Sequence, residues 1–353
     1  MTALLEARDV VKHFPLRRSM FGEPDLVHAL DGVSLTIAAG ELVALVGESG
    51  SGKTTLARCI LGLATPTSGT ISLDGQDLTT SRGKELRDFR RRVQPVFQDP
   101  YASLDPRWSV AQTIREPLDA YKVGTSQERD ARVTQLLDRV GLPAGTAQRR
   151  PHELSGGQRQ RVGIAAALAL EPDLIVADEP VSALDVSVQA QILNLLTDLN
   201  RDLGVAILLI THDLAVVEHI CDRAVVMYLG LVAEEGPVDL LFGDPEHPYT
   251  QALMAAIPYP DPDRRMTTAT VGGEVPNPIH PPPGCRFHTR CPLAIERCRQ
   301  EPPVLSEFGP GHRAACFVTS ARRDAQGRSS VEPQPSAGAP GRACPGSTSV
   351  VAE

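Results

Sequence analysis

The chain has 353 residues, a formal net charge of −8 and 42% hydrophobic residues, which predicts one large domain with a sizeable core and a smaller appended part. The negative balance argues against a dedicated nucleic-acid-binding protein, and no apolar run approaches the ~18 residues of a membrane span. The N-terminus has no basic stretch followed by an apolar one, so we expect no signal peptide and a cytoplasmic protein. Its seven cysteines are then expected to be thiols or metal ligands rather than disulfides.

The first predicted elements are two strands, because apolar residues alternate loosely along residues 4–11 and again along residues 27–37. A basic, irregular stretch separates them, and Phe14 lies where that stretch begins. An aromatic side chain at this point could stack on an adenine ring, or it could belong to the core. The sequence by itself leaves both interpretations open.

Residues 47–54 read Gly-Glu-Ser-Gly-Ser-Gly-Lys-Thr, which fits the phosphate-binding P-loop pattern G-x-x-x-x-G-K-[ST]. An apolar run of strand length precedes the loop and a helix-compatible run follows it, so a chance glycine-rich turn is disfavoured. Inward-pointing backbone N–H groups and the positive end of the helix favour phosphates. Lys53 would contact the β- and γ-phosphates, and the Thr54 hydroxyl would ligate Mg²⁺. The predicted nucleotide-binding residues here are Gly47, Ser49, Gly50, Ser51, Gly52, Lys53, Thr54 and Thr55.

Beyond the P-loop, short strand-like runs at residues 70–75 and 93–98 flank a charged run at residues 84–92, which predicts a solvent-exposed helix. From about residue 101 to 170, helix-compatible runs prevail. This change of character predicts a helical insertion in an α/β domain. Ser126 is the expected N-cap of one of its helices.

Two apolar runs carry candidate catalytic groups at their carboxyl ends, as buried parallel strands do. Residues 174–178 end in Asp178 and are followed at once by Glu179. Asp178 suits the outer coordination sphere of Mg²⁺, and Glu179 suits a base that takes a proton from water. A second run at residues 205–210 leads to His212. This histidine could hydrogen-bond a γ-phosphate, although a lone histidine is more often structural.

Taken in order, these pieces resemble the ATP-binding cassette (ABC) ATPases. Residues 154–158 read Leu-Ser-Gly-Gly-Gln, which is the signature sequence of that family. The resemblance covers about residues 4–255 and implies a P-loop α/β fold with an added antiparallel β portion and a helical subdomain at about residues 101–170. The matching positions are Gln98 (Q-loop), Ser155, Gly156, Gly157 and Gln158 (signature), Asp178 and Glu179 (Walker B), Asp185 (D-loop) and His212 (switch).

The resemblance also implies a mechanism. Two cassettes would pair head to tail, with ATP between Lys53 of one and the signature of the other, so that Ser155 and Gly157 serve the partner's γ-phosphate. The signature and Asp185 would thus be nucleotide-binding residues. The other implied roles are catalysis for Glu179, His212 and Gln98, magnesium binding for Thr54, Gln98 and Asp178, and adenine stacking for Phe14.

Further stretches, residues 97–107, 181–196 and 247–253, look like those of oligopeptide and dipeptide importers. The resemblance therefore implies ATP-driven uptake of a peptide, with the chain peripheral to the cytoplasmic face of the membrane. The implied partners are a second ATPase subunit, two permeases and an extracytoplasmic solute-binding protein. Related nickel importers share much of this pattern, so the solute stays open, as does the choice between homodimer and heterodimer.

Two other function classes fit less well. A soluble cassette protein that acts on ribosomes or DNA would usually carry two cassettes or a long coiled coil, and this chain has one P-loop and no sustained heptad. A non-hydrolytic regulatory module would not need both Glu179 and His212.

Proline becomes frequent after about residue 255, which predicts an appended segment, residues 256–320, that is not part of the sheet. Its four cysteines have the spacings C-x5-C, C-x6-C and C-x17-C, which match neither common zinc sites nor ferredoxins. Four thiolates suit tetrahedral Zn²⁺ or a [4Fe–4S] cluster. The same importers have a C-terminal extension with this cysteine pattern, and that resemblance favours the cluster. The expected ligands are Cys285, Cys291, Cys298 and Cys316, with His288 and His312 as possible substitutes.

The remaining residues, 321–353, are rich in Ser, Pro, Gly and Arg. They show no apolar period, so we expect a disordered tail.

Overall fold

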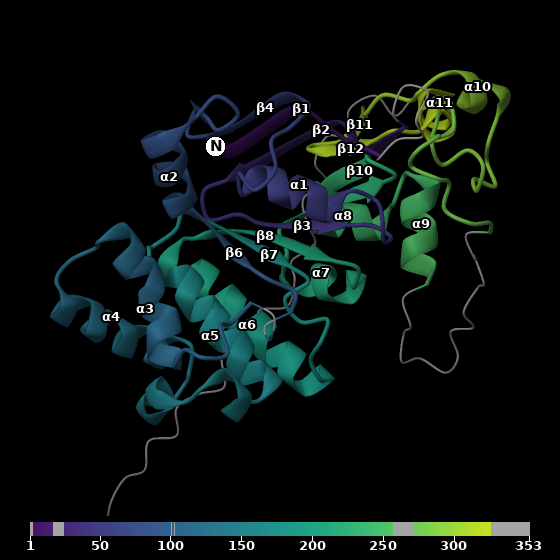
Figure 1. The fold of residues 1–353 in the computed structure, drawn as a ribbon. Coiled ribbons are helices and arrows are strands. Elements are labelled where there is room, and N and C mark those ends of the chain that lie inside the picture. Colours follow the sequence, from purple (N-terminus) through teal and green to yellow (C-terminus); the bar gives the residue numbers. More distant parts are fainter. Residues whose placement is uncertain (1–2, 17–24, 100, 102, 257–271, 326–353) are drawn as a thin grey trace, which may run out of the picture.

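The computed structural model describes residues 3–16, 25–99, 101, 103–256 and 272–325, and it contains the expected antiparallel β portion. This small sheet has the order β2(Leu26–Ala38), β1(Ala3–Pro15), β4(Ser68–Leu73) and β5(Gln76–Asp77), with antiparallel pairing throughout. Its strands are drawn in purple and blue in Figure 1. Leu5, Ala7 and Val10 of β1 are buried, so the sheet covers the core with one apolar face.

The larger sheet has eight strands, of which five consecutive strands, reaching one edge, are parallel. In spatial order it contains β11(Ser306–Gly309), β12(His312–Ala314), β10(Leu231–Pro237), β9(Arg223–Tyr228), β3(Leu42–Val46), β8(Ala206–Thr211), β7(Leu174–Asp178) and β6(Val93–Val96). The strands from β9 to β6 pair in parallel. The predicted apolar strands therefore lie in the middle of a buried parallel sheet.

Each face of this sheet has its own core. Leu208 and Ile210 of β8 pack toward α1(Lys53–Ile60) and the small sheet. Ile207 and Leu209, their neighbours along the strand, pack toward α5(Gly156–Leu168) and α6(Val186–Leu203). Because successive side chains alternate between the faces, both faces need apolar residues, which explains the continuous apolar runs in the sequence.

The predicted helical subdomain is present. It contains α3(Val110–Tyr121), α4(Ser126–Arg139), the 3₁₀ turns η1(Ala144–Gln148) and η2(Pro151–Glu153), and the start of α5, grouped at lower left in Figure 1. The predicted charged helix is α2(Gly83–Arg92). The expectation that Ser126 caps a helix is wrong by one residue. Thr125 is the N-cap, because it can form a reciprocal capping box with Glu128, whose side chain accepts the Thr125 N–H.

The expectation that the chain after residue 255 is separate from the sheet is wrong. β12 pairs with β10, and β11 pairs with β12, so both extend the large sheet at one edge. The remaining helices of the described residues are α7(Leu214–Ile220), α8(Val238–Gly243), α9(Pro248–Ala255), α10(Glu296–Gln300) and α11(Phe317–Ala325). The predicted disordered tail begins inside α11, and residues 326–353 lie outside the described residues.

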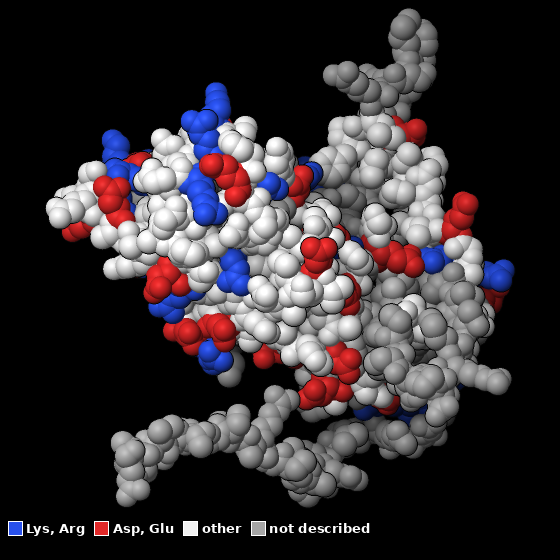
Figure 2. Space-filling view, turned by 90° about the horizontal axis from the view of Figure 1, so that it is seen from below, with Lys and Arg blue, Asp and Glu red and all other residues white. Residues whose placement is uncertain are grey.

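Within the described residues, no helix is both long and apolar enough to cross a bilayer. Figure 2 shows the molecule from below, with the helical subdomain at its left. On this face basic and acidic side chains alternate around a largely uncharged surface. Such a mixed surface differs from the continuous basic stripe of a nucleic-acid-binding face.

Candidate functional site

The P-loop joins the buried strand β3 to helix α1, and two of its glycines have no room for a side chain. Gly47 and Gly52 have φ angles of +150° and +104°. A Cβ atom on Gly47 would lie 2.2 Å from the carbonyl oxygen of Met227, and one on Gly52 would lie 2.4 Å from that of Ala29. The loop therefore needs glycine for its conformation and for its packing.

Lys53 is held inside this loop. Its Nζ donates to the carbonyl oxygens of Gly47 at 2.6 Å and Glu48 at 2.9 Å. Burial lowers the pKa of Lys53, while the carboxylates of Glu179, Asp178 and Glu48 oppose that shift. The ammonium group has three N–H donors, so phosphate oxygens can join these two carbonyls as its partners.

Thr54 and Asp178 form a pair of hard oxygen ligands. The exposed Thr54 hydroxyl donates to Asp178 Oδ1 at 3.5 Å across the gap between α1 and the end of β7. Burial raises the pKa of Asp178 and the charge of Glu179 adds to the effect, whereas the Thr54 hydrogen bond and Lys53 lower it. A hydroxyl and a carboxylate in this arrangement fit Mg²⁺.

Glu179 brings the three predicted catalytic residues together. Its Oε2 accepts from Gln98 Nε2 at 2.8 Å, and its Oε1 lies 3.3 Å from His212 Nδ1. Glu179 has a φ angle of +46°, a left-handed conformation that non-glycine residues rarely adopt. The amide nitrogen of Gln98 is engaged by Glu179, so any contact of Gln98 with Mg²⁺ would use its amide oxygen.

The signature residues form the first turn of α5. Ser155 is the N-cap, and it exchanges two hydrogen bonds with Gln158 in a capping box. A Cβ atom on Gly157 would lie 2.4 Å from Val188 Cγ1 of α6, whose N-cap is Asp185. Among the described residues, no hydrogen bond or ion pair joins the signature to the P-loop of its own chain. The signature is thus built independently of this chain's phosphate site.

Phe14 lies near the end of β1, opposite Val27 of β2. Its side chain is exposed, and Lys12 Nζ lies 4.9 Å from the ring centroid. The interpretation of Phe14 as a core residue is therefore wrong. An exposed ring is free to stack on a base, which remains a prediction.

Comparison with known proteins places this geometry in a family. Residues 30–182 match the ABC transporter family, and residues 233–298 match the family described as oligopeptide/dipeptide transporter, C-terminal region. The chain is 52% identical over 317 residues to the probable peptide ABC transporter ATP-binding protein y4tS of Sinorhizobium fredii, covering 90% of each chain. It is 46% identical to the dipeptide transport ATP-binding protein DppF of Escherichia coli, covering 89% of this chain and 94% of that protein. The chain belongs to the ATP-binding subunits of peptide ABC transporters.

A solved structure supports the same fold. The ATP-binding cassette MJ0796, a dimer in a post-hydrolysis state bound to ADP and phosphate, superposes with a TM-score of 0.60 at 32% identity. The match covers 66% of this chain and 98% of that cassette. The rest of this chain includes the part that matches the peptide-transporter extension.

Two residues of the part that matches the peptide-transporter family, residues 233–298, contact the P-loop directly, which sequence analysis missed. Tyr249 Oη of α9 accepts the backbone N–H of Glu48 at 2.8 Å. Arg290 donates to both carboxylate oxygens of Glu48, at 2.7 and 3.1 Å. Neither residue belongs to a motif of the nucleotide site, so no local sequence signal points to them.

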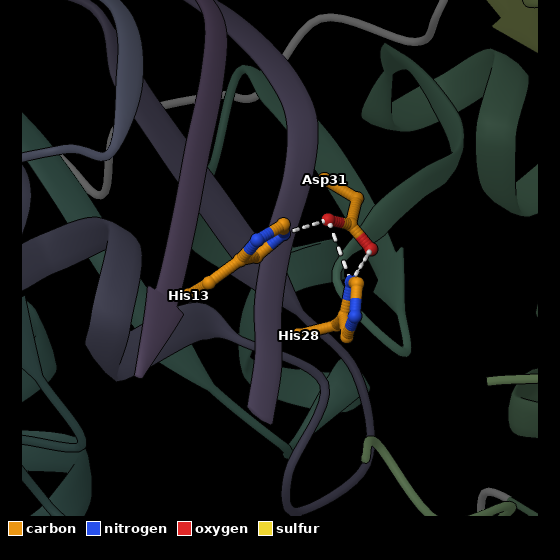
Figure 3. Close-up of side chains that lie close together, drawn as sticks. All are labelled: His13, His28 and Asp31. Atoms are coloured by element: carbon orange, nitrogen blue, oxygen red, sulfur yellow. Dashed lines mark hydrogen bonds and ion pairs between the residues drawn. The ribbon is translucent and has the colours of Figure 1, made fainter. Parts of the chain in front are cut away.

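A second contact lies beside Phe14. Figure 3 shows His13 of β1 and His28 of β2 turned toward the carboxylate of Asp31, and their ligand atoms lie within 4.8 Å of one another. Such a trio could hold a metal ion. However, His13 and His28 hydrogen-bond to Asp31, and Arg286 of the extension donates to its Oδ2. The cluster is therefore an ion-pair contact that attaches the extension to the small sheet.

The four extension cysteines are free thiols that influence one another. Burial raises the pKa of Cys285 to about 11, and the charges of Cys298, Cys291 and Cys316 add to the effect. The Cys285 N–H donates to the Cys298 carbonyl at 2.8 Å, which joins two of the loops. Cys285 and Cys298 are therefore neighbours in the fold, and metal binding by the four thiols remains a prediction.

The two histidines named as substitutes are engaged elsewhere. His312 Nε2 pairs with the buried Glu234 of β10 at 2.7 Å, and His288 Nδ1 bonds the Cys285 carbonyl. Each contact uses one ring nitrogen, so the four thiols remain the expected ligands and the histidines remain possible substitutes.

Proposed function

We propose that this chain binds and hydrolyses ATP to drive import of di- or oligopeptides, as a peripheral subunit on the cytoplasmic face of the membrane. The observation that carries the proposal is the Glu179 carboxylate between Gln98 and His212, directly after the strand that ends in Asp178. The peptide class is supported by the match of residues 233–298 and by relatives named for peptide, di/tripeptide and dipeptide transport.

ATP is bound and hydrolysed by groups from four segments. The P-loop amides and Lys53 bind the β- and γ-phosphates. Thr54, Asp178 and the Gln98 amide oxygen would hold Mg²⁺, which would supply positive charge to neutralise the phosphates. Glu179 takes the proton of the attacking water. His212 orients Glu179 and donates a hydrogen bond to the γ-phosphate.

The signature acts on a second cassette. Ser155 and Gly157 complete the site of an opposing ATPase subunit, and the signature of that subunit completes this one. A different second ATPase fits the importers that this chain resembles, so we favour a heterodimer. Closure and reopening of the cassette dimer would move two permeases, and a solute-binding protein would deliver the peptide to them.

The test is the variant Glu179→Gln in the transporter assembled from co-expressed subunits. The base is removed while the size is kept, so the altered site should lose about 10²- to 10⁴-fold in turnover and retain Mg-ATP binding. Peptide uptake into vesicles should fall with it. In a heterodimer the substitution changes only one of the two ATP sites. The deciding measurement is therefore the single-turnover rate of hydrolysis at the site of this subunit. Hydrolysis and peptide uptake at wild-type rates by Glu179→Gln would refute the assignment of Glu179 as the base. Uptake of Ni²⁺ in place of peptides by the wild-type transporter would show that the solute is nickel.

The same extension is proposed to hold a [4Fe–4S] cluster on Cys285, Cys291, Cys298 and Cys316. Zinc with bonds of about 2.3 Å would place its sulfur ligands about 3.8 Å apart. Within the described residues, no three of these thiols have sulfur atoms that all lie within 4.8 Å of one another. Four thiolates suit either group, and the cluster is proposed because of the resemblance to importers whose C-terminal extension has this cysteine pattern. Its role would be to cross-link the extension.

Anaerobically purified protein should be brown and contain about four irons and four sulfides per chain. Cys291→Ser should bleach it and largely spare ATP binding. Cys221→Ser is the matched control, since Cys221 is also half-buried but lies outside the extension. A colourless anaerobic preparation with one zinc per chain would overturn the cluster, and one without metal would overturn the site.

A further inference from the structure

The side chain of Glu48, the second residue of the P-loop, points into the C-terminal extension. Its carboxylate receives two parallel hydrogen bonds from Arg290, at 2.7 and 3.1 Å, a bidentate geometry that fixes direction as well as distance. Its backbone N–H is bound by Tyr249, and its carbonyl holds Lys53. The two peptide units that flank Glu48, whose carbonyls hold Lys53, are thus restrained from outside the cassette motifs.

Arg290 is itself held rigidly. Its side chain is 6% exposed, against 28% for Glu48. The guanidinium lies 5.7 Å from the ring of Tyr228 and 6.0 Å from that of Phe287, and Nη1 lies 3.3 Å from Tyr228 Oη. Its Nε is buried without a hydrogen-bond partner in the described part of the chain. Glu48 is the anionic partner that compensates the burial of this charge. Loss of either residue therefore leaves the charge of the other without its partner.

The segment that carries Arg290 is anchored on both sides of the nucleotide site. Arg286, four residues earlier, pairs with Asp31 of the small sheet and with the carbonyl of Leu229. Asp31 in turn holds His13, the neighbour of Phe14 (Figure 3). Residues 286–290 therefore bridge the strand that presents Phe14 and the loop that presents Lys53.

We propose that Arg290 is a positioning residue for ATP: by holding Glu48, the extension keeps the P-loop in its phosphate-binding conformation. The inference rests on the proposed ATP site and names a residue outside the cassette motifs that controls it. When the ion pair is broken, Glu48 is free to rotate and its carbonyl no longer holds Lys53 in place. Nucleotide affinity should fall, while the hydrolytic groups Glu179 and His212 are untouched.

The experiment measures Mg-ATP affinity of the full-length chain, and KM and kcat in the assembled transporter, for Arg290→Gln, Glu48→Gln and the double variant. Each single variant should weaken affinity by about 3- to 30-fold and raise KM, with kcat nearly unchanged. The double variant should be no weaker than either single one, because both remove the same interaction. Arg290→Lys keeps the charge without the bidentate fork and should recover part of the affinity.

Arg297→Gln is the matched control. Arg297 also precedes a cysteine of the extension and pairs with a carboxylate, but that partner, Glu301, belongs to the extension. This variant should bind ATP as the wild type does. The iron content and melting temperature of every variant are measured in parallel. A loss of affinity caused by damage to the cysteine site is then recognised. Glu48→Gln breaks the same ion pair but leaves every extension residue unchanged. Its ATP affinity therefore tests the proposal even if Arg290→Gln does not fold.

Lys53→Ala distinguishes a failure of the positioning inference from a failure of the proposed ATP site. If Lys53→Ala loses Mg-ATP binding while Arg290→Gln and Glu48→Gln bind normally, the positioning inference is wrong and the ATP site stands. If Lys53→Ala also binds normally, the ATP site itself is wrong. Additive losses in the double variant, or a fall in melting temperature with unchanged affinity, would show that the pair is only a structural tether.

Discussion

His247 forms the N-cap of α9, and its imidazole must be neutral there, because Nδ1 accepts the N–H of Tyr249 at 3.0 Å. Burial lowers the pKa of His247 from 6.5 to about 4, although Glu234 opposes the shift. The unfolded chain takes up this proton near pH 6.5, whereas the folded protein resists it down to about pH 4. The stability is therefore full above pH 6.5 and lost as the pH falls toward 4, by at most about 3 kcal/mol.

Urea unfolding at pH 7.5, 6.5 and 5.5 measures this effect. His247→Asn keeps a hydrogen-bond acceptor at the cap but does not titrate, so its free energy of unfolding should depend less steeply on pH than that of the wild type. Equal slopes for the two proteins would assign the acid sensitivity to other groups.

The nucleotide residues of one subunit were predictable because each lies in a short motif next to a strand or helix. Lys53, Asp178, Glu179 and His212 occupy their predicted places around one sheet edge. Arg290 and Tyr249 were not predictable, because they lie 242 and 201 residues from Glu48, and only the fold brings them together.

The contact between α5 and α6 depends on the absence of a side chain at Gly157. Gly157→Ala would place a methyl group 2.4 Å from Val188 Cγ1, so we expect a loss of about 1–3 kcal/mol in the free energy of unfolding. Adding Val188→Ala should recover most of the loss. Chemical unfolding of the two variants checks this, and a single variant as stable as the wild type would contradict it.

Gly163→Ala is the control on the same helix. A Cβ atom there would meet no atom within 4 Å, so alanine should stabilise the protein by about 0.5–1 kcal/mol through its better helix propensity. If both glycine variants are destabilised equally, the Val188 contact is not the cause.

The long elements were predicted well and the short ones were not. β7 spans Leu174–Asp178 as expected, and α2 begins within one residue of its predicted start. β11 and β12 have four and three residues. A strand this short is too short for an alternating apolar pattern to be detected in the sequence. They form because β10 has a free edge beside them and because His312 can reach the buried Glu234.

At the scale of the whole molecule, one chain contains each part of an ATP site but not one complete site. The signature on α5 makes no hydrogen bond or ion pair with its own P-loop among the described residues, and in the proposed pairing a second cassette supplies the signature. The purified chain alone should therefore hydrolyse ATP poorly. Turnover measured with the oligomeric state in the same preparation checks this, and vigorous hydrolysis by a strict monomer would contradict it.

The contact between Glu48 and Arg290 also sets an order of events during synthesis. The ribosome makes the P-loop early and Arg290 242 residues later, which at about 5–20 residues per second is a delay of roughly 10–50 s. During that interval the nascent cassette has its phosphate loop but not the arginine that restrains it, and the edge of β10 is unpaired. A chain cut short before the extension would accordingly leave the ribosome with a loosely formed nucleotide site. If Arg290 positions the P-loop as proposed, tight ATP binding is acquired only after residue 290 has been synthesised.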